Sequence, residues 1–380
     1  MRHVVFVVVT TMSCSLGCER QTTHEMNQPA SAGVEVTEPD DGAATASTMP
    51  DLERGRALYD TYCGFCHGAD GEGYLADNAN ALAHQGFLST ATDEFLKVAI
   101  IEGRPGTPMS PWGTKNGGPI TDDDAKDIIG YMRTWQTEPS KDLPTTTIAG
   151  SPMRGQVTYG AFCRSCHGAN GEGVTAISLN HPWFLASASD AFIRDAIVHG
   201  RLPTPMPAYA DLLRADEIDD LVAFIRAWQR PVTEIVQPPF EPDVAGGLIN
   251  PDGPDAEFML RDDRFVPAQQ VKDALDDGQA VYIIDARPVA DYLDGHVEGA
   301  VSIPFYRIDK VLEKIPTDRM IVTYCGCPHA VSGQAADALL AAGFERVAIL
   351  DEGYYFWVDQ GWPVHVGEPQ PMNEDVAGPD

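Results

Sequence analysis

The chain contains 380 residues, with 56 acidic and 26 basic side chains, which gives a formal net charge of −30 at pH 7. A chain of this length predicts two to three domains. The acidic excess argues against a nucleic acid as partner, because Lys and Arg are needed to neutralise a phosphate backbone. Two explanations of the excess stay open: it steers a basic redox protein, or it only keeps the protein soluble.

Residues 1–18 have the pattern of an export signal. Their apolar run at positions 4–9 is too short to cross a bilayer as a mature helix. The small residues before Cys18 resemble a bacterial lipoprotein cleavage site, in which Cys18 would be acylated and become the first residue. Ser15 stands where such sites usually carry leucine, so ordinary signal-peptide cleavage nearby stays open. Residues 19–50 are rich in Thr, Ala, Glu and Pro without an apolar period, which predicts a flexible tether.

Two copies of the motif Cys-x-x-Cys-His follow, 100 residues apart. Their residues are Cys63, Cys66 and His67 in the first copy, and Cys163, Cys166 and His167 in the second. This spacing is typical of c-type haem attachment, in which two thiols form thioethers with the haem and the next imidazole binds its iron. Residues 54–73 and 154–173 are identical at 11 of 20 positions. A zinc site would need four ligands, and no further Cys lies near either motif.

A methionine follows each motif in the same context. Met109 ends a Thr-Pro-Met segment 42 residues after His67, and Met206 ends another 39 residues after His167. The proline favours an extended arm that can hold the thioether over the second face of the iron. A His/Met pair raises the reduction potential and fills both axial positions, which suits electron transfer rather than O₂ binding. The alternative is that each methionine only packs in a core.

Apolar residues at helical spacing surround both motifs. They predict one helix over Asp51–Tyr62 and another that starts at the N-cap Thr121, continues with an acidic first turn and carries its apolar stripe to Trp135. The second copy repeats the closing helix over residues 216–228.

An opening helix, the cysteine motif, a Pro-Met loop and a closing helix with an aromatic residue make each unit resemble a small class I cytochrome c domain. The resemblance covers residues 51–137 and 152–230, with a linker at 138–151. It implies two all-α domains, each folded round one covalently bound haem c, which supplies the apolar body that so short a chain lacks. Such haem attachment implies export, so we expect a bacterial cell-envelope protein, either periplasm-facing or a surface lipoprotein.

The pattern changes after the second unit. Residues 231–257 are acidic and interrupted by prolines, which predicts a linker. Strand-like and helix-like runs then alternate, with buried strands expected at 280–284, 320–324 and 346–350 and helices at 266–275 and 332–342. This alternation predicts an α/β domain with a central parallel sheet.

Several phrases of this region are similar to those of a rhodanese domain. In chain order they are Ile284-Asp-Ala-Arg287, Gly295-His-Val-Glu-Gly-Ala-Val-Ser-Ile-Pro304, Tyr324-Cys325, Asp351-Glu-Gly353 with Trp357, and Gly361-Trp-Pro-Val364. The resemblance covers residues 258–367 and leaves 368–380 as a disordered tail. In rhodaneses the cysteine after a central strand becomes a persulfide, stabilised by inward backbone N–H groups and a helix N-terminus. Cys325 matches that position, whereas Asp285 and Arg287 are expected to support the fold.

The loop after Cys325 departs from the family pattern. It lacks the arginine that phosphatases and arsenate reductases require and has Val331 in that place, so phosphate chemistry is disfavoured. Cys327 is a candidate resolving thiol, with a strained disulfide and half of a soft-metal site as alternatives. His329 is a further candidate, which would favour the thiolate. An inert binding module with incidental cysteines also stays open.

These motifs together predict a multidomain protein with two all-α cytochrome c domains and one α/β rhodanese-like domain. The expected function is that of an exported dihaem cytochrome, lipid-anchored at Cys18, that exchanges electrons with an envelope redox partner and binds or transfers sulfane sulfur at Cys325. Two alternatives stay open. A sulfur-compound oxidoreductase would oxidise a thiol or sulfane sulfur at Cys325 and pass electrons to the haems, and an accessory subunit would use an inert rhodanese domain for docking. Sulfurtransferase activity is therefore an open question.

Overall fold

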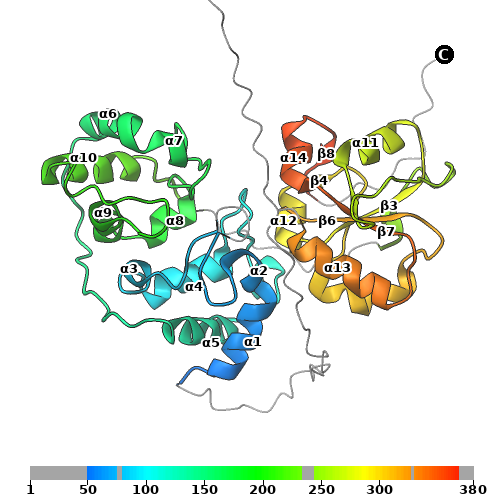
Figure 1. Cartoon of the computed structure of the whole chain (residues 1–380), viewed down its shortest axis with the longest axis horizontal. Coiled ribbons are helices and arrows are strands. Elements are labelled where there is room, and N and C mark those ends of the chain that lie inside the picture. Colours follow the sequence, from blue (N-terminus) through cyan, green and yellow to red (C-terminus); the bar gives the residue numbers. More distant parts are fainter. Residues whose placement is uncertain (1–48, 75–78, 233–243, 327–328, 368–380) are drawn as a thin grey trace, which may run out of the picture. The chain divides into compact units, whose positions relative to one another are not determined.

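The computed structural model describes residues 49–74, 79–232, 244–326 and 329–367 (Figure 1). The predicted signal peptide with Cys18, nearly all of the predicted tether, Cys327 and the predicted tail lie outside these ranges. Within them, no helix is long and apolar enough to cross a membrane. The described residues belong to one compact unit.

The chain from Met49 to Thr137 forms a first helical region. Its helices are α1 (Leu52–Tyr62), α2 (Gly64–His67), α3 (Gln85–Leu88), α4 (Asp93–Glu102), the 3-10 helix η1 (Thr114–Asn116) and α5 (Asp122–Arg133). The Asp51 side chain accepts hydrogen bonds from two backbone N–H groups of the first turn of α1, and Thr121 forms a capping box with Asp124 at the start of α5. These caps begin both helices where the sequence predicts them.

The second helical region repeats this order. It contains α6 (Pro152–Phe162), α7 (Arg164–His167), α8 (Pro182–Ser187), α9 (Asp190–His199) and α10 (Ala215–Arg226). In both regions a long opening helix leads into a single-turn helix, and a long closing helix packs against the opening one. The internal sequence repeat is therefore also a structural repeat.

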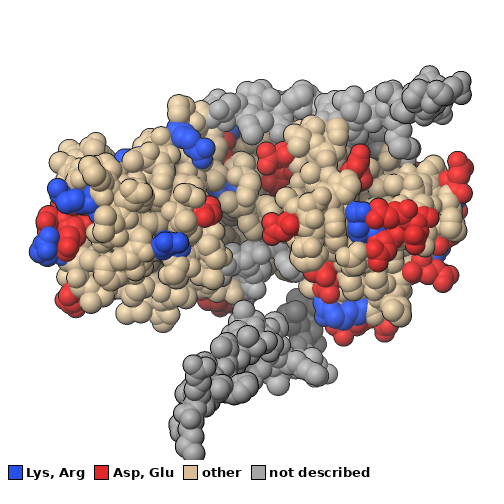
Figure 2. Space-filling model, turned by 90° about the horizontal axis from the view of Figure 1, so that it is seen from above, with Lys and Arg blue, Asp and Glu red and all other residues tan. Residues whose placement is uncertain are grey.

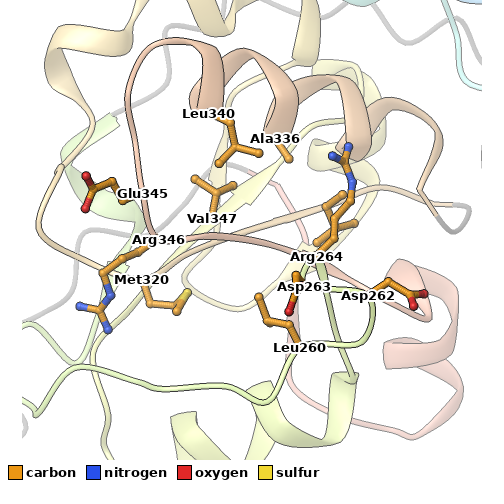
Figure 3. A pocket seen from close by; sticks show the side chains of 11 residues that line it. Leu260, Asp262, Asp263, Arg264, Met320, Ala336, Leu340, Glu345, Arg346 and Val347 are labelled. Carbon is orange, nitrogen blue, oxygen red and sulfur yellow. The ribbon is translucent and has the colours of Figure 1, made fainter.

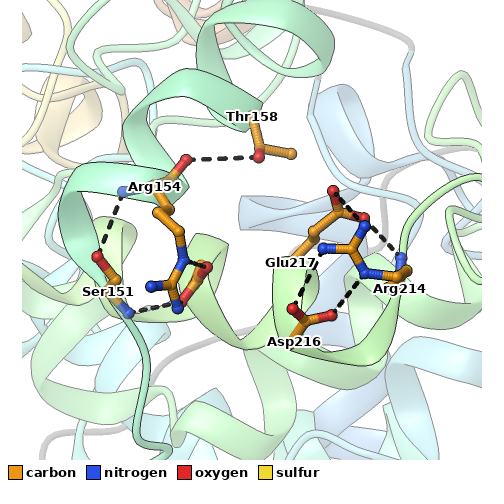
Figure 4. A network of polar contacts seen from close by, with 7 residues as sticks. Ser151, Arg154, Thr158, Arg214, Asp216 and Glu217 are labelled. Atoms are coloured by element: carbon orange, nitrogen blue, oxygen red, sulfur yellow. Dashed lines mark hydrogen bonds and ion pairs between the residues drawn. The ribbon is translucent and has the colours of Figure 1, made fainter.

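A polar network ties the start of α6 to α10 (Figure 4). The Arg154 guanidinium binds the Asp220 carboxylate at two points, 2.6 Å from Nε to Oδ2 and 2.8 Å from Nη2 to Oδ1. The backbone N–H of Ser151 donates to the same carboxylate at 2.6 Å. Arg214 pairs with Asp216 at the beginning of α10. Because Asp220 accepts from two groups at the start of α6, it fixes how the two helices meet.

The two long helices of each region approach each other at a glycine. A Cβ atom on Gly155 would lie 2.0 Å from the backbone oxygen of Asp220, and one on Gly55 would lie 2.1 Å from that of Asp127. Both distances are far below van der Waals contact, so only a residue without a side chain fits there. Gly160, further along α6, is different, because no heavy atom lies within 4 Å of such a Cβ.

The C-terminal part of the chain, from residue 244 to 367, forms an α/β domain. Its elements are η2 (Val244–Gly247), β1 (Leu248–Ile249), β2 (Phe265–Val266), α11 (Ala268–Asp276), β3 (Val281–Asp285), α12 (Val289–Asp294), β4 (His296–Val297), β5 (Val301–Ser302), η3 (Phe305–Lys310), η4 (Leu312–Lys314), β6 (Ile321–Tyr324), α13 (Ala330–Ala341), β7 (Val347–Leu350), α14 (Gly353–Asp359) and β8 (Val364–His365).

The main sheet of this domain has the strand order β1-β3-β6-β7-β2, with β5 paired to β3. Its pairs are parallel except β1–β3, and β4 and β8 form a separate antiparallel pair. Tyr282 and Ile284 of β3 share a core with α13, whereas Val281 and Ile283 share one with α11 on the other face. Figure 1 shows these helices on opposite sides of the sheet. The predicted fold class is confirmed: helical regions followed by an α/β domain with a mainly parallel sheet.

Part of the predicted linker, residues 231–257, belongs to the folded α/β domain. Residues 248–249 form β1, which pairs antiparallel with β3, and the side chains of Val244 and Ala256 are buried. A two-residue strand is too short to produce a recognisable periodicity, and the prolines around it favour a linker. The folded α/β domain therefore begins before the predicted boundary at residue 258.

Gly155→Ala tests the helix crossing. The added methyl group would force α6 and α10 apart, so we expect the free energy of unfolding to fall by roughly 1–3 kcal/mol, the usual cost of overpacking. Urea denaturation followed by circular dichroism measures this loss. Gly160→Ala in the same helix is the matched control and should leave stability unchanged or raise it by up to about 1 kcal/mol. Equal losses in the two variants would contradict the close approach.

Candidate functional site

The first Cys-x-x-Cys-His motif lies on a single helical turn. Cys63 ends α1, and α2 carries Cys66 and His67. The backbone N–H groups of Cys66 and His67 donate to the Cys63 carbonyl oxygen at 3.2 and 3.0 Å. The second motif repeats both hydrogen bonds at the same lengths. Each turn thus keeps two thiols and one imidazole together, as haem attachment requires.

Each motif histidine has one ring nitrogen fixed by a backbone carbonyl group. His67 Nδ1 lies 2.9 Å from the oxygen of Asn80, and His167 Nδ1 lies 2.9 Å from that of Ile177. Since a carbonyl oxygen only accepts, Nδ1 carries the proton and Nε2 keeps its lone pair. Burial lowers the pKa of both imidazoles, which favours the neutral form. A neutral imidazole oriented in this way suits iron ligation through Nε2.

Both Thr-Pro-Met segments form closed loops of the same design. In the first loop the Arg104 N–H donates to the Met109 carbonyl at 2.6 Å, and the Met109 N–H donates to Thr107 Oγ1 at 3.3 Å. The second loop repeats the two bonds at 2.8 and 3.3 Å. The side chains of Met109 and Met206 are half-buried. Each methionine is therefore held on a defined loop rather than in the middle of a core.

An arginine that the sequence analysis did not single out opens each loop. Burial lowers the pKa of Arg104 to about 10, and its Nη1 donates to the Gly103 carbonyl at 2.7 Å. Within the described ranges, Arg201 has a buried Nη2 without a hydrogen-bond partner, and its ion pair with Asp195 is long, at 3.8 Å. Haem carries two propionates, and the Nη2 atom of Arg201 could donate to such an anion. The sequence signal was an arginine five positions before each methionine.

Two histidines connect the helical regions reciprocally. His84 of the first region donates from Nε2 to the Leu202 carbonyl of the second methionine loop at 2.8 Å. His181 of the second region donates from Nε2 to the Pro105 carbonyl of the first loop at 3.1 Å. Burial lowers the pKa of His181 to about 4, so its ring is neutral at pH 7. Each methionine loop is therefore held in part by the neighbouring region.

Cys325 directly follows β6, at the carboxyl end of a central strand. Its side chain is 1% exposed, and its Sγ lies 3.1 Å from Ser332 Oγ in the first turn of α13. Its carbonyl oxygen accepts from the Tyr354 N–H at 2.9 Å. Because α13 is twelve residues long and starts at Ala330, its positive end lies beside the thiol. Cys325 therefore lies at the end of a central strand and beside the start of α13, the position in which the resemblance to rhodaneses places it.

His329 is turned to other partners. Its Nε2 lies 2.9 Å from Asp351 Oδ1, and the centre of its ring lies 4.0 Å from that of Phe265. Arg261 donates to the same carboxylate at 2.6 Å and, together with His329, lowers the Asp351 pKa. His329 directly precedes α13 and has a left-handed backbone conformation, with φ of 74°. Its contacts therefore indicate a supporting role at the start of that helix.

A buried ion pair lies under the cysteine loop. Arg287 Nη2 donates to Asp285 at 2.6 Å and to the Gly295 carbonyl at 2.6 Å. The Tyr324 hydroxyl donates to Asp285 at 2.7 Å, and the Arg287 guanidinium lies 4.0 Å from the ring centre of Tyr354. Both charged residues thus connect strands and helices, in agreement with the expectation that they support the fold.

A cavity of about 380 Å³ lies elsewhere on the α/β domain (Figure 3), and Cys325 is not among the residues that line it. Apolar side chains of α13 and β7 form one part of its wall, and Arg264 and Arg346 another. Both arginines are already paired, Arg264 with Asp337 at 2.6 Å and Arg346 with Asp255 at 2.9 Å. Among the described residues that line the cavity, both cations therefore already have a carboxylate partner.

Acidic side chains gather on the α/β domain, where Figure 2 shows them on the right of the view. Residues 258–367 contain 17 acidic and 9 basic side chains, whereas residues 152–230 contain 8 and 7. The negative charge is thus concentrated away from the second helical region. Residues 51–137 contain 13 acidic and 7 basic side chains, so a basic partner would be attracted to the first helical region as well as to the α/β domain.

Two family models match the chain. One, described as cytochrome c oxidase, cbb3-type, subunit III, matches residues 50–132 and 150–225. The other, a rhodanese-like domain, matches residues 267–360. Cytochrome c domains of this type imply covalently bound haem c. The motif imidazoles, fixed through Nδ1, the methionine loops and the Nη2 atom of Arg201 fit that group.

Curated relatives support both parts. A sulfurtransferase from Allochromatium vinosum is 30% identical over 99 residues, which cover 26% of this chain and 92% of that protein. A cytochrome bc1 complex cytochrome c subunit from Mycobacterium bovis is 27% identical over 237 residues, which cover 60% of this chain and 78% of the subunit. The HTH-type transcriptional regulator Rv0324 of Mycobacterium tuberculosis is 34% identical over 89 residues, 23% of this chain, and the chain spans only 39% of that regulator's length.

Arg201→Gln tests the contact between the second methionine loop and a haem propionate. A cation beside the haem favours the reduced iron, so its loss should lower the potential of one haem. We expect a tenfold change in the reduction equilibrium, about 60 mV for one electron, in a spectroelectrochemical titration. Arg56→Gln on the exposed side of α1 is the control and should change nothing. If the unmodified protein, Arg201→Gln and Arg56→Gln have the same haem reduction potentials, the contact is ruled out.

Proposed function

Because this chain belongs to the rhodanese-like family and joins cytochrome c electron-transfer domains to its rhodanese-like domain, we propose that it is an exported dihaem electron carrier that holds a sulfane sulfur on Cys325. The repeated ligand geometry supports the dihaem part, since both motif histidines are fixed through Nδ1 and both methionine loops close alike. The sulfur part rests on the place of Cys325 between β6 and the start of α13.

The haem-binding residues have the following proposed roles. Cys63 and Cys66 would attach one haem covalently and Cys163 and Cys166 the other. His67 with Met109 and His167 with Met206 would hold the two irons. The bound haem supplies one-electron transfer at a raised potential. The chain contributes orientation through the Nδ1 hydrogen bonds and positive charge through the arginines of the methionine loops.

At the sulfur site, the Cys325 thiolate attacks the outer sulfur of a sulfane donor such as thiosulfate. A new sulfur–sulfur bond forms, the donor's sulfur–sulfur bond breaks, and sulfite leaves with the electron pair. The product is a persulfide anion on Cys325, beside the Ser332 hydroxyl and the positive end of α13. Cys327 is proposed as the resolving thiol, which attacks Cys325 Sγ, releases hydrosulfide and leaves a disulfide. His329 has only a supporting part in this scheme.

Location and partners belong to the same proposal. We propose a cell-envelope protein anchored by a lipid on Cys18. The N-terminal sequence supports this location, as does the export of proteins to which haem is attached in this way. If the anchor is correct, Cys18→Ser should lose its attachment to the membrane. The similarity to a subunit of a cytochrome bc1 complex supports a redox partner in the envelope. The acidic α/β domain favours a basic surface on that partner.

The haem assignment predicts two covalently bound haems per chain. They should survive acid-acetone extraction, because thioether bonds are not broken by acid. Cys166→Ala should weaken the linkage of one haem only, as measured by the haem absorbance retained by the protein. A single haem per chain, or haem that extracts freely from the unmodified protein, would refute the assignment.

The sulfur assignment predicts a persulfide at Cys325. Incubation of the reduced protein with thiosulfate should add about 32 Da, one sulfur atom, to the Cys325 peptide in mass spectrometry. Cys327→Ser should keep this adduct and change its lifetime, whereas Cys325→Ser should abolish it. An adduct confined to Cys327 would reverse the two roles, and no adduct with any of several sulfane donors would favour an inert docking module.

A further inference from the structure

The side chain of Cys66 packs against Cys325. Cys66 belongs to the first haem-attachment motif, and Cys325 is the candidate persulfide cysteine. Val331, in the first turn of α13, also packs against Cys325, at the position where the sequence lacks an arginine. Cys325 is only 1% exposed, and Cys66 is one of the residues that cover it. A residue proposed to attach haem therefore closes part of the sulfur site.

This contact is part of a wider interface. The Tyr306 hydroxyl donates to the Gly117 carbonyl at 3.2 Å. The Phe305 ring centre lies 5.8 Å from that of Tyr62 and 6.3 Å from that of Trp112. Phe305 and Tyr306 follow β5, and Cys325 follows β6, so the interface uses the carboxyl ends of parallel strands. That edge is where open α/β sheets bind their ligands.

From this juxtaposition we infer that Cys325 takes hydrosulfide as its substrate and passes the electrons to the haem attached at Cys66. The inference rests on the proposed function, because it needs both the haem and a sulfur-binding Cys325. The step balances as Cys325–S⁻ + HS⁻ → Cys325–S–S⁻ + H⁺ + 2e⁻. A sulfur–sulfur bond forms, each sulfur atom is oxidised by one electron, and the proton leaves to water.

The contact with Cys66 selects a reduced sulfur compound. Sulfur transfer from a sulfane donor releases no electrons for the iron. In thiosulfate, for example, the sulfite leaving group keeps the electron pair of the broken sulfur–sulfur bond. A haem beside Cys325 therefore contributes only when the incoming sulfur is reduced. Among reduced compounds, hydrosulfide is the smallest, which fits a thiol enclosed by Cys66, Val331 and Ser332.

Two electrons also match the number of proposed haems. The first helical region, which contacts Cys325, meets the second through the reciprocal histidine contacts and through Phe95 and Phe192, whose ring centres lie 4.9 Å apart. Electrons that reach the haem at Cys66 therefore have a packed path to the haem of the second region. Each persulfide formed should thus reduce two ferric haems, one electron to each.

The test uses the full-length protein with both haems oxidised, in the absence of oxygen. After addition of sodium sulfide, haem reduction is followed by absorbance and the mass of the Cys325 peptide is determined in the same sample. We expect two haems reduced per persulfide formed, and at least tenfold slower reduction in Cys325→Ser, whose haems ascorbate should still reduce at the original rate. Equal rates with sulfide in the two proteins would overturn the inference.

Val289→Arg separates the contact from the sulfur chemistry. Val289 lies against the first helical region, since a Cβ on Gly117 would come within 3.2 Å of it, and it is outside the Cys325 loop. The variant should still form the persulfide from thiosulfate and reduce its haems at least tenfold more slowly with sulfide. In the unmodified protein, loading with thiosulfate should lower the potential of one haem only, because a persulfide is a stronger acid than a thiol and loading therefore increases the average negative charge beside that haem.

These measurements distinguish the two levels of the proposal. If thiosulfate leaves no adduct on Cys325, the proposed sulfur function fails. If the adduct forms and neither the haem potential nor the rate of haem reduction by sulfide depends on Cys325, the inference fails and the proposed function stands. The potential shift needs no variant, so a misfolded Val289→Arg would not prevent a decision.

Discussion

The crossing of the opening and closing helices at a glycine is the contact on which the position of each Cys-x-x-Cys-His motif depends. The opening helix ends at the first motif cysteine, so the place where it meets its partner sets where the motif begins. Tyr59, one turn before Cys63, packs edge-on against Trp135 after the closing helix and donates to the Gly68 carbonyl at 2.8 Å. The helix crossing and the aromatic contact therefore hold the Cys-x-x-Cys-His motif in place together. Tyr159 and Trp228 repeat this arrangement in the second region.

The candidate sulfur site is also held in place by neighbouring residues. Cys325 is positioned by the end of β6, by Ser332 and by the backbone of Tyr354. Under it, the buried Arg287–Asp285 pair is also hydrogen-bonded to the Gly295 carbonyl and the Tyr324 hydroxyl, and such additional bonds help an internal ion pair to be tolerated. The charge of this pair is thus kept inside the domain, and aromatic rings are part of the surface that meets the first helical region, where Phe305 contacts Tyr62 and Trp112.

Much of this organisation could be predicted from the sequence because it depends on local spacing. The cysteine motifs fit one helical turn, Thr121 and the acidic residues after it begin α5, and continuous apolar runs identify β3, β6 and β7. These features are decided by residues within a few positions of each other. The strand β1 could not be found in this way, because two apolar residues among prolines have no periodicity.

The sequence by itself determined the haem motifs, the fold classes and the position of Cys325, since each is a short-range pattern with a chemical reason. Tertiary structure decided what surrounds them. It placed His329 beside Asp351 and Phe265 and packed Cys66 against Cys325. Among the described residues, it left the Nη2 atom of Arg201 without a hydrogen-bond partner beside a methionine loop. These contacts join residues far apart in the chain, and no local pattern encodes them, because they depend on how complete helices and strands pack against one another.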